Sequence, residues 1–342
     1  MRLRCLSSLL LLGHACADAP LDALVAAPAP ETVSLRFVLE LPPDDPPLQD
    51  LPVAVFLRPD RFDTSVSADG GDLRFVDESG ARLAHEVDTW ASTGIVWVRI
   101  PEARDGTVFF LAEGFEPVTG DVWADYEGVW HLNDLEDSAA PTPLPSARSE
   151  PSAGLVGGAQ AVSGAGGIRF TERDLLGGAA GATLSAWVFP DRANGQIISI
   201  SDSTGLGNSR AFLSLENGRV AAGATVAPEQ ERPQVESASV VAAARWYHLA
   251  ATTNFADGDL AIFVDGERVS TLRAEFGAAR VEDAPAALVV FGDEEDATDG
   301  RAFFGRLDEI RVSRRAFSPA RVMAEARSAR DELVRYERVV SE

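Results

Sequence analysis

A run of acidic residues in the last third of the chain has the residue types and spacing best suited to chemistry. Five carboxylates occupy the seven positions from Asp293 to Asp299, between two glycines. Calcium binds several oxygen ligands in flexible geometry, which such a loop can supply. We therefore predict a calcium site with Asp293, Glu294, Asp296 and Asp299 as ligands. The alternative is a solvated acidic loop between two strands that binds nothing.

Other residue types exclude several kinds of site. The histidines beyond the leader are His85, His131 and His248, without a His-Glu-x-x-His pattern, and both cysteines lie in the first 16 residues. A cysteine zinc site is therefore excluded. The chain has no lysine, which removes a P-loop lysine and Schiff-base chemistry. We expect these histidines to be structural and predict no catalytic residue.

The charge of the chain restricts its partners. The net charge is −23, and all 30 basic residues are arginine. Nucleic acid and anionic lipid surfaces both require a basic face. We therefore expect no nucleic-acid partner and no peripheral binding to anionic lipid.

The first residues have the layout of a secretory signal. Two arginines precede the apolar run Leu9–Leu12, and small residues surround Cys16. The run is too short for a permanent membrane anchor. Cleavage before Cys16 would leave a lipidated cysteine, whereas Ala15-Cys16-Ala17 also fits ordinary signal peptidase. We expect an exported protein, either an outer-membrane lipoprotein or a secreted or periplasmic one, with residues 1–16 as signal and 17–31 as an Ala/Pro-rich linker.

Alternation of apolar and polar residues predicts short strands over most of the remaining chain. Residues 32–116, with turns such as Asp69-Gly70-Gly71, read as a small β-sandwich. Residues 117–160 contain several prolines and read as a junction and loop. Residues 161–317 contain about eleven strand-like runs, which is typical of two packed sheets. Between two of these runs, Asp265-Gly266 predicts a type I′ hairpin turn.

Residues 318–342 are predicted to form a C-terminal helix and tail. Ser318 suits a helix N-cap, and Pro319 suits the first helical position. Residues 332–340 fit either a terminal strand or a continuation of the helix.

The first domain resembles an uncharacterised bacterial domain of unknown function. The resemblance lies in Asp69–Asp77 (DGGDLRFVD), His85–Trp90 (HEVDTW) and Val96–Pro101 (VWVRIP), in that order. His85 and Asp88 replace the usual Tyr and Glu. In that family the domain is often followed by a laminin G-like domain.

The second domain resembles the laminin G-like, concanavalin A-like jelly roll. Four ordered motifs carry the resemblance: Thr183–Pro190 (TLSAWVFP), Trp246–Ala250 (WYHLA), Ile262–Gly266 (IFVDG) and Phe304–Val312 (FGRLDEIRV). The two resemblances imply an all-β fold class, with a small N-terminal β-sandwich, a jelly roll and a short C-terminal helix. The motifs do not include the family's calcium ligands.

The jelly-roll fold also hosts glycoside hydrolases, which place their carboxylates on one face of a strand. The pairs Glu86/Asp88, Glu172/Asp174 and Glu294/Asp296 lack the third acid of a Glu-x-Asp-x-Glu run. Asp308 and Glu309 would point to opposite faces of an extended strand. Hydrolysis is therefore the least favoured function.

Two non-catalytic functions remain open. One is an exported protein that binds a glycan or an envelope or extracellular protein through the jelly roll. The other is a structural envelope lipoprotein that acts as a spacer or assembly module. In both, a lipid anchor at Cys16, if cleavage before Cys16 leaves one, would be the only membrane contact. Because a fold does not fix a function, the sequence alone does not choose between them.

Overall fold

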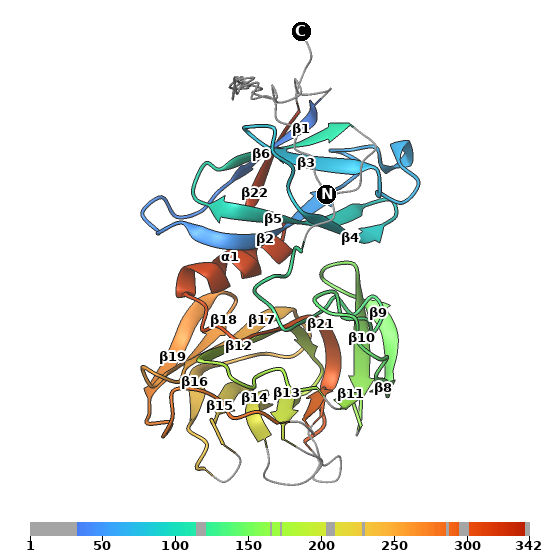
Figure 1. The fold of residues 1–342 in the computed structure, drawn as a ribbon. Coiled ribbons are helices and arrows are strands. Elements are labelled where there is room, and N and C mark those ends of the chain that lie inside the picture. The colour runs from blue at the N-terminus through green and yellow to red at the C-terminus, as the bar shows by residue number, and fades with distance from the viewer. Residues whose placement is uncertain are drawn as a thin grey trace, which may run out of the picture.

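A computed structural model describes residues 33–113, 121–164, 166–171, 173–202, 209–227, 230–284, 287–293 and 301–338. These residues form two β lobes, and the one described α-helix, α1 (Pro319–Ala329), lies between them (Figure 1). From the top of Figure 1 the order is two sheets, the helix, and two more sheets. The predicted all-β class is confirmed. No helix among the described residues is long and apolar enough to cross a membrane.

The N-terminal lobe consists of two antiparallel sheets packed face to face. The first sheet has the order β22-β1-β6-β3, and the second has the order β2-β5-β4. Its elements are β1 (Val33–Leu39), β2 (Leu48–Leu57), a 3-10 turn (Thr64–Val66), β3 (Leu73–Asp77), β4 (His85–Trp90), β5 (Gly94–Ala103), β6 (Val108–Glu113) and β22 (Val334–Arg338). Phe37 and Phe109 stack in its core with ring centroids 4.7 Å apart. Both rings are fully buried, so alternation along β1 and β6 fixes which face packs inward.

The strand β22 settles the two alternatives for the C-terminal tail. It pairs antiparallel with β1, with Tyr336 opposite Phe37. The Tyr336 hydroxyl donates to Asp331 at 2.7 Å and accepts from the Phe56 amide at 2.9 Å. Residues near the end of the chain therefore complete a sheet that begins with the first described strand.

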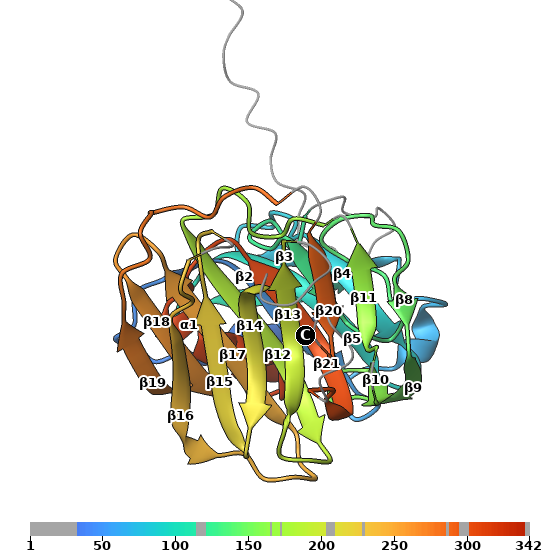
Figure 2. The ribbon, with the colours of Figure 1, turned by 90° about the horizontal axis from the view of Figure 1, so that it is seen from below.

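The C-terminal lobe is a jelly roll of one eight-stranded and one seven-stranded sheet. The eight-stranded sheet runs β19-β18-β17-β12-β21-β10-β9, with β7 paired to β21, and the other runs β16-β15-β14-β13-β20-β11-β8 (Figure 2). The first contains β7 (Gly128–Trp130), β9 (Ser149–Ala153), β10 (Gly158–Ser163), β12 (Gly181–Pro190), β17 (Tyr247–Asn254), β18 (Asp259–Val264), β19 (Glu267–Arg273) and β21 (Phe304–Ser313). The second contains β8 (Ser146–Ala147), β11 (Ile168–Thr171), β13 (Gly195–Ser201), β14 (Ser209–Glu216), β15 (Arg219–Ala224), β16 (Gln234–Val240) and β20 (Leu288–Phe291). Apolar side chains from both sheets fill the space between them.

The prediction of a loop over residues 117–160 is wrong for much of that stretch. This stretch contains β7, β9 and the start of β10, which belong to the eight-stranded sheet, and β8, which belongs to the seven-stranded sheet. Prolines misled the prediction, because proline usually interrupts a strand. β9 is an edge strand that pairs only with β10. An edge strand tolerates proline, because the missing N–H of Pro151 need not pair with a second neighbouring strand.

Two local predictions are confirmed. Asp265 and Gly266 both have positive φ, 53° and 83°, as a type I′ turn between β18 and β19 requires. The Ser318 side chain accepts a hydrogen bond from the Arg321 amide, and Pro319 begins α1.

A third core cluster joins the lobes. Trp97 and Phe56 enter it from the N-terminal lobe, Trp187 and Phe263 enter it from the jelly roll, and Val322 enters it from α1. The helix also contributes Ala324 to the core of the N-terminal lobe. The outer face of the eight-stranded sheet is therefore covered over its centre, and the polar groups there are buried.

Candidate functional site

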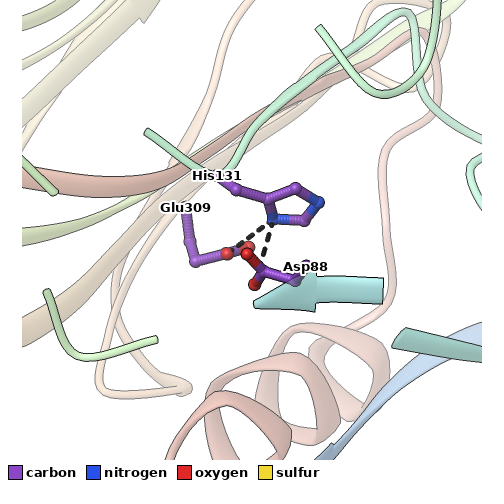
Figure 3. A group of neighbouring side chains, drawn as sticks. All are labelled: Asp88, His131 and Glu309. Carbon is purple, nitrogen blue, oxygen red and sulfur yellow. Dashed lines mark hydrogen bonds and ion pairs between the residues drawn. The ribbon is translucent and has the colours of Figure 1, made fainter. Parts of the chain in front are cut away.

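A buried group of one histidine and two carboxylates lies in the layer between the lobes. Asp88 comes from β4, His131 follows β7, and Glu309 comes from β21 (Figure 3). His131 Nδ1 is 2.7 Å from Glu309 Oε1 and 3.8 Å from Asp88 Oδ2. The side chains of Glu309 and Asp88 are 1% and 0% exposed. Three segments distant in sequence therefore meet in one dry site.

A bulge in β21 positions the carboxylates. The register of β12 with β21 shifts between Ser185 and Trp187, and Glu309 has a φ of 50°. In such a bulge, an extra residue of one strand lies opposite a single residue of the partner strand. Successive side chains then no longer alternate strictly between the two faces of the sheet. Leu307 and Ile310 both point into the jelly-roll core, so Asp308 and Glu309 share the face toward the other lobe. The expectation that they point to opposite faces is wrong for this reason.

Asp308 accepts hydrogen bonds from the backbone and does not form an ion pair with any described residue. Its Oδ2 accepts hydrogen bonds from the amides of Leu155 and Val156, at 2.7 and 3.0 Å. Complete burial raises the pKa of Asp308 well above its ordinary value, and Glu309 beside it adds to the rise. Burial therefore favours the protonated form of Asp308.

Glu309 is held by two cations. Arg311 donates to its Oε2 at 2.7 Å, while His131 binds Oε1. Burial opposes its ionisation, but His131 and Arg311 hold the pKa of Glu309 below its usual value. Burial likewise opposes protonation of His131, and Glu309, Glu86 and Asp88 together raise its pKa well above normal. The centre of the site is therefore a carboxylate between an imidazolium and a guanidinium.

Aromatic rings enclose these cations. The His131 ring stacks on Trp97 with centroids 5.8 Å apart and lies 5.4 Å from the Trp123 ring. Arg311 lies 4.3 Å above the Trp97 ring. The faces of indole rings attract cations while excluding water. The tryptophans therefore strengthen the ion pairs around Glu309 by lowering the local dielectric.

Asp88 lies farther from His131 than Glu309 does, at 3.8 Å against 2.7 Å. Its carboxylate accepts hydrogen bonds from Trp97 Nε1 at 3.2 Å and from the Asn133 side chain. Burial raises the pKa of Asp88 to about 6, despite the attraction of His131. The negative charge of Glu309 contributes to this rise. Asp88 is therefore the group that changes charge near neutral pH.

The network continues into α1. Arg321 contacts Asp125 at 2.8 Å and Glu325 at 2.9 Å, and Tyr126 donates to Glu325 at 2.5 Å. Arg311 lies 3.9 Å from Glu325 and links this group to Glu309. One chain of buried ion pairs thus joins the N-terminal lobe, the helix and the jelly roll.

The group of Asp88, His131 and Glu309 can be compared with a metal site and with an acid–base catalytic site. Two carboxylates and an imidazole, with ligand atoms all within 4.8 Å, form a donor set for a divalent metal. Arg311, in direct contact with Glu309, opposes a second cation there. Acid–base catalysis requires access for a substrate, and three cavities on the described part of the chain, of about 690, 540 and 470 Å³, are lined by residues other than these three. The geometry best suits an electrostatic tie between the lobes.

The structure describes only one member of the predicted calcium site. Asp293 is buried, and its Oδ2 accepts the Gly166 amide at 2.6 Å, which stabilises a turn with positive φ. Glu294, Asp296 and Asp299 lie outside the described residues, as does Cys16. The calcium site and the lipidation site stay predictions.

The other two histidines lie apart from this group. His85 is half-buried beside Phe75, and burial lowers its pKa. His248 is buried beside Trp187, and burial lowers its pKa to about 3, with Arg311 and Arg330 adding to the effect. Sequence reasoning treated all three histidines alike and missed the partners of His131. The available signal was Trp130-His131 together with the adjacent acids Asp308 and Glu309.

Replacing Glu309 by glutamine tests the tie. Glu309→Gln removes the anion between His131 and Arg311, so two cations lose their main partner in a dry layer. We expect the free energy of unfolding to fall by about 3–5 kcal/mol in urea titrations. Glu337→Gln, which removes a partly exposed partner of Arg36, serves as the control and should cost less than about 1 kcal/mol. Equal effects of the two changes would contradict the tie.

Asp88 makes a specific contribution to pH dependence. Its folded pKa, about 6, exceeds the ordinary 3.8, so the folded state keeps a proton that the unfolded state releases. This contribution lowers stability as pH rises from about 4 to about 6, by about 3 kcal/mol in total. Asp88→Asn should therefore gain stability relative to the unsubstituted protein over this range and keep the gain above it. Urea titrations at pH 4.5, 5.5 and 7 measure the difference, with the exposed Asp44→Asn as control. A difference that does not change with pH would refute this role.

Comparison with known proteins bears on the jelly roll. Residues 162–323 match the laminin G-like family model described as the Concanavalin A-like lectin/glucanases superfamily. No curated protein matches the chain.

Three solved structures match part of this chain. They are the binding domain of Paraclostridial Mosquitocidal Protein 1 (13% identity, TM-score 0.47, covering 60% of this chain and 52% of that one), the Ruminococcus gnavus IT-sialidase CBM40 bound to alpha2,3 sialyllactose (16%, 0.42, 49% and 95%) and a native heptameric SAP-like pentraxin from Limulus polyphemus (17%, 0.37, 48% and 80%). This chain thus spans about half the length of the mosquitocidal binding domain. The predicted concanavalin A-like jelly roll is confirmed by the family match.

Proposed function

We propose that this protein is a non-catalytic, exported binding protein whose jelly roll binds a glycan or a protein. The observation that carries the proposal is that the carboxylates on β21 are buried and already have partners within the protein. In a lectin/glucanase fold, acids on a sheet face are the groups that a hydrolase would use. Here Glu309 is neutralised by His131 and Arg311 in a layer covered by the other lobe. Binding therefore fits this geometry better than hydrolysis.

A structural role is the second candidate, and one observation favours it. The lobes share a core cluster and a chain of buried ion pairs, which couple them more tightly than a linker alone would. Tight coupling suits a spacer or assembly module. In this case the jelly roll would set the distance between two attached components without binding a glycan.

Export and anchoring rest on the first 16 residues. We place the protein outside the cytoplasm, as an outer-membrane lipoprotein lipidated at Cys16, or as a secreted or periplasmic protein. Expression of the full chain in a bacterial host tests the lipid anchor. The unsubstituted chain should partition into the membrane fraction, and Cys16→Ser should move it to the soluble fraction. Identical fractionation of the two chains would refute the anchor.

Glycan-array binding, with calcium and with chelator, tests the binding function. The purified chain without residues 1–16 should bind a subset of glycans. If the loop that begins at Asp293 holds calcium, the metal should also raise the melting temperature, because a ligand that binds only the folded state stabilises it. Asp293→Asn is the matched variant for the calcium arm. Absence of binding to every glycan, together with an unchanged melting temperature, would contradict the glycan form and leave the spacer role.

A further inference from the structure

An arginine–aromatic surface lies on the eight-stranded sheet, next to the core cluster that joins the lobes, against which Trp246 packs. It consists of Phe189 in β12, Phe304 and Arg306 in β21, Trp246 just before β17, and Arg192 just after β12. Phe189, Trp246, Phe304 and Arg306 are half-buried, and Arg192 is exposed. We name these five residues the arginine–aromatic surface.

Both guanidinium groups are stacked on rings. Arg306 lies 3.7 Å from the centroid of Phe189 and 5.5 Å from that of Trp246. Arg192 lies 3.6 Å from the centroid of Phe304. A stacked guanidinium keeps its rim of N–H donors free while its orientation is fixed. The rings therefore hold both arginines ready to bind an anion.

The backbone fixes this arrangement. Phe189 is directly opposite Arg306 in the pairing of β12 with β21. Gly305 separates Phe304 from Arg306 and has a φ of 150°. A Cβ at Gly305 would stand 2.2 Å from the Phe189 carbonyl oxygen, so only glycine permits the close approach of the strands here. Three of the five residues, Phe189, Phe304 and Arg306, are thus positioned by two central strands.

These two arginines lack the partners that other arginines have. Within the part of the chain that the structure describes, the guanidinium groups of Arg192 and Arg306 have neither a hydrogen bond nor an ion pair. Nearby Arg245 pairs with Asp265 at 2.8 Å, and Arg311 pairs with Glu309. Two guanidiniums are thus held on aromatic rings without a described carboxylate partner, in a chain with 53 acidic residues. Among the described residues, no carboxylate pairs with these two guanidiniums, so an anionic ligand can occupy that place.

We infer that the arginine–aromatic surface binds a carboxylated pyranose, such as a hexuronate unit of an acidic polysaccharide. This inference rests on the proposed glycan-binding function and names the ligand class and the site. The carboxylate matches the two-donor edge of a guanidinium. The half-exposed edges of Trp246, Phe189 and Phe304 give the apolar face of the sugar ring a surface to contact. Two guanidiniums without a described carboxylate partner give this acidic protein a local contact for an acidic polymer.

The experiment measures binding of the purified chain to polygalacturonate and alginate, with dextran as the neutral polymer and dextran sulfate as the sulfated one. It is run at 0.15 M salt, where a Debye length of about 8 Å screens repulsion by the rest of the chain. The chain should bind the carboxylated polymers and not dextran. Arg306→Gln and Arg192→Gln should each weaken binding about tenfold or more, because each removes a charge-assisted hydrogen-bond donor.

Two further variants separate the site from net charge and from folding. Arg104→Gln removes one positive charge from the N-terminal lobe, where Arg104 pairs with Glu102, and should leave affinity unchanged. Arg306→Lys keeps the charge but loses the planar donor edge, and it should bind more weakly than the unsubstituted chain. Melting temperatures of all variants should stay near that of the unsubstituted chain.

Each of the other outcomes contradicts either the carboxylate assignment, the whole inference, or the inference together with the proposed function. Binding to dextran sulfate alone overturns the carboxylate assignment. Binding to a neutral glycan that is unaffected by Arg306→Gln and Arg192→Gln overturns the inference and leaves the proposed binding function standing. A similar loss in Arg104→Gln shows non-specific attraction and also overturns the inference. Absence of binding to any polymer here and to any glycan on the array overturns both.

Discussion

The two lobes depend on one electrostatic constraint, which is that charge buried between them must be balanced there. Removing a carboxylate or a guanidinium from water costs several kcal/mol unless a partner replaces the lost hydration. Glu309 has two such partners, His131 and Arg311, and each comes from a different part of the jelly roll. Tryptophan rings from the N-terminal lobe and the inter-lobe segment close over them. Packing of the lobes and ionisation of the site therefore stabilise each other.

The same residues show why acidic pairs on a jelly-roll strand are ambiguous. A bulge with a left-handed, non-glycine Glu309 brings Asp308 and Glu309 to one face, an arrangement that a hydrolase would also need. Their partners differ, however, since Asp308 accepts backbone amides and Glu309 is neutralised. The protonation states follow from these partners. Chemistry is thus determined by what surrounds the carboxylates, and only secondarily by their spacing.

Features that depend on local sequence could be predicted. Asp265-Gly266 specifies its own turn, Ser318-Pro319 specifies the start of α1, and four motifs identify the jelly roll. Features that depend on distant pairing could not. β9 reads as a loop until β10 lies beside it, and alternation along β21 fails where the register with β12 shifts. The arginine–aromatic surface belongs to this second class, because the partners of Arg306 are more than fifty residues away in sequence.

The pairing of β22 with β1 has a consequence for synthesis. The strand that completes the first sheet is made after the whole jelly roll, so the first lobe cannot close during translation of its own residues. The jelly roll is in effect inserted into the first lobe. Long-range closure of this kind is slow, because the chain must order a large loop before the contacts form. Until β22 is made, the edge of β1 that it covers has no partner among the described strands.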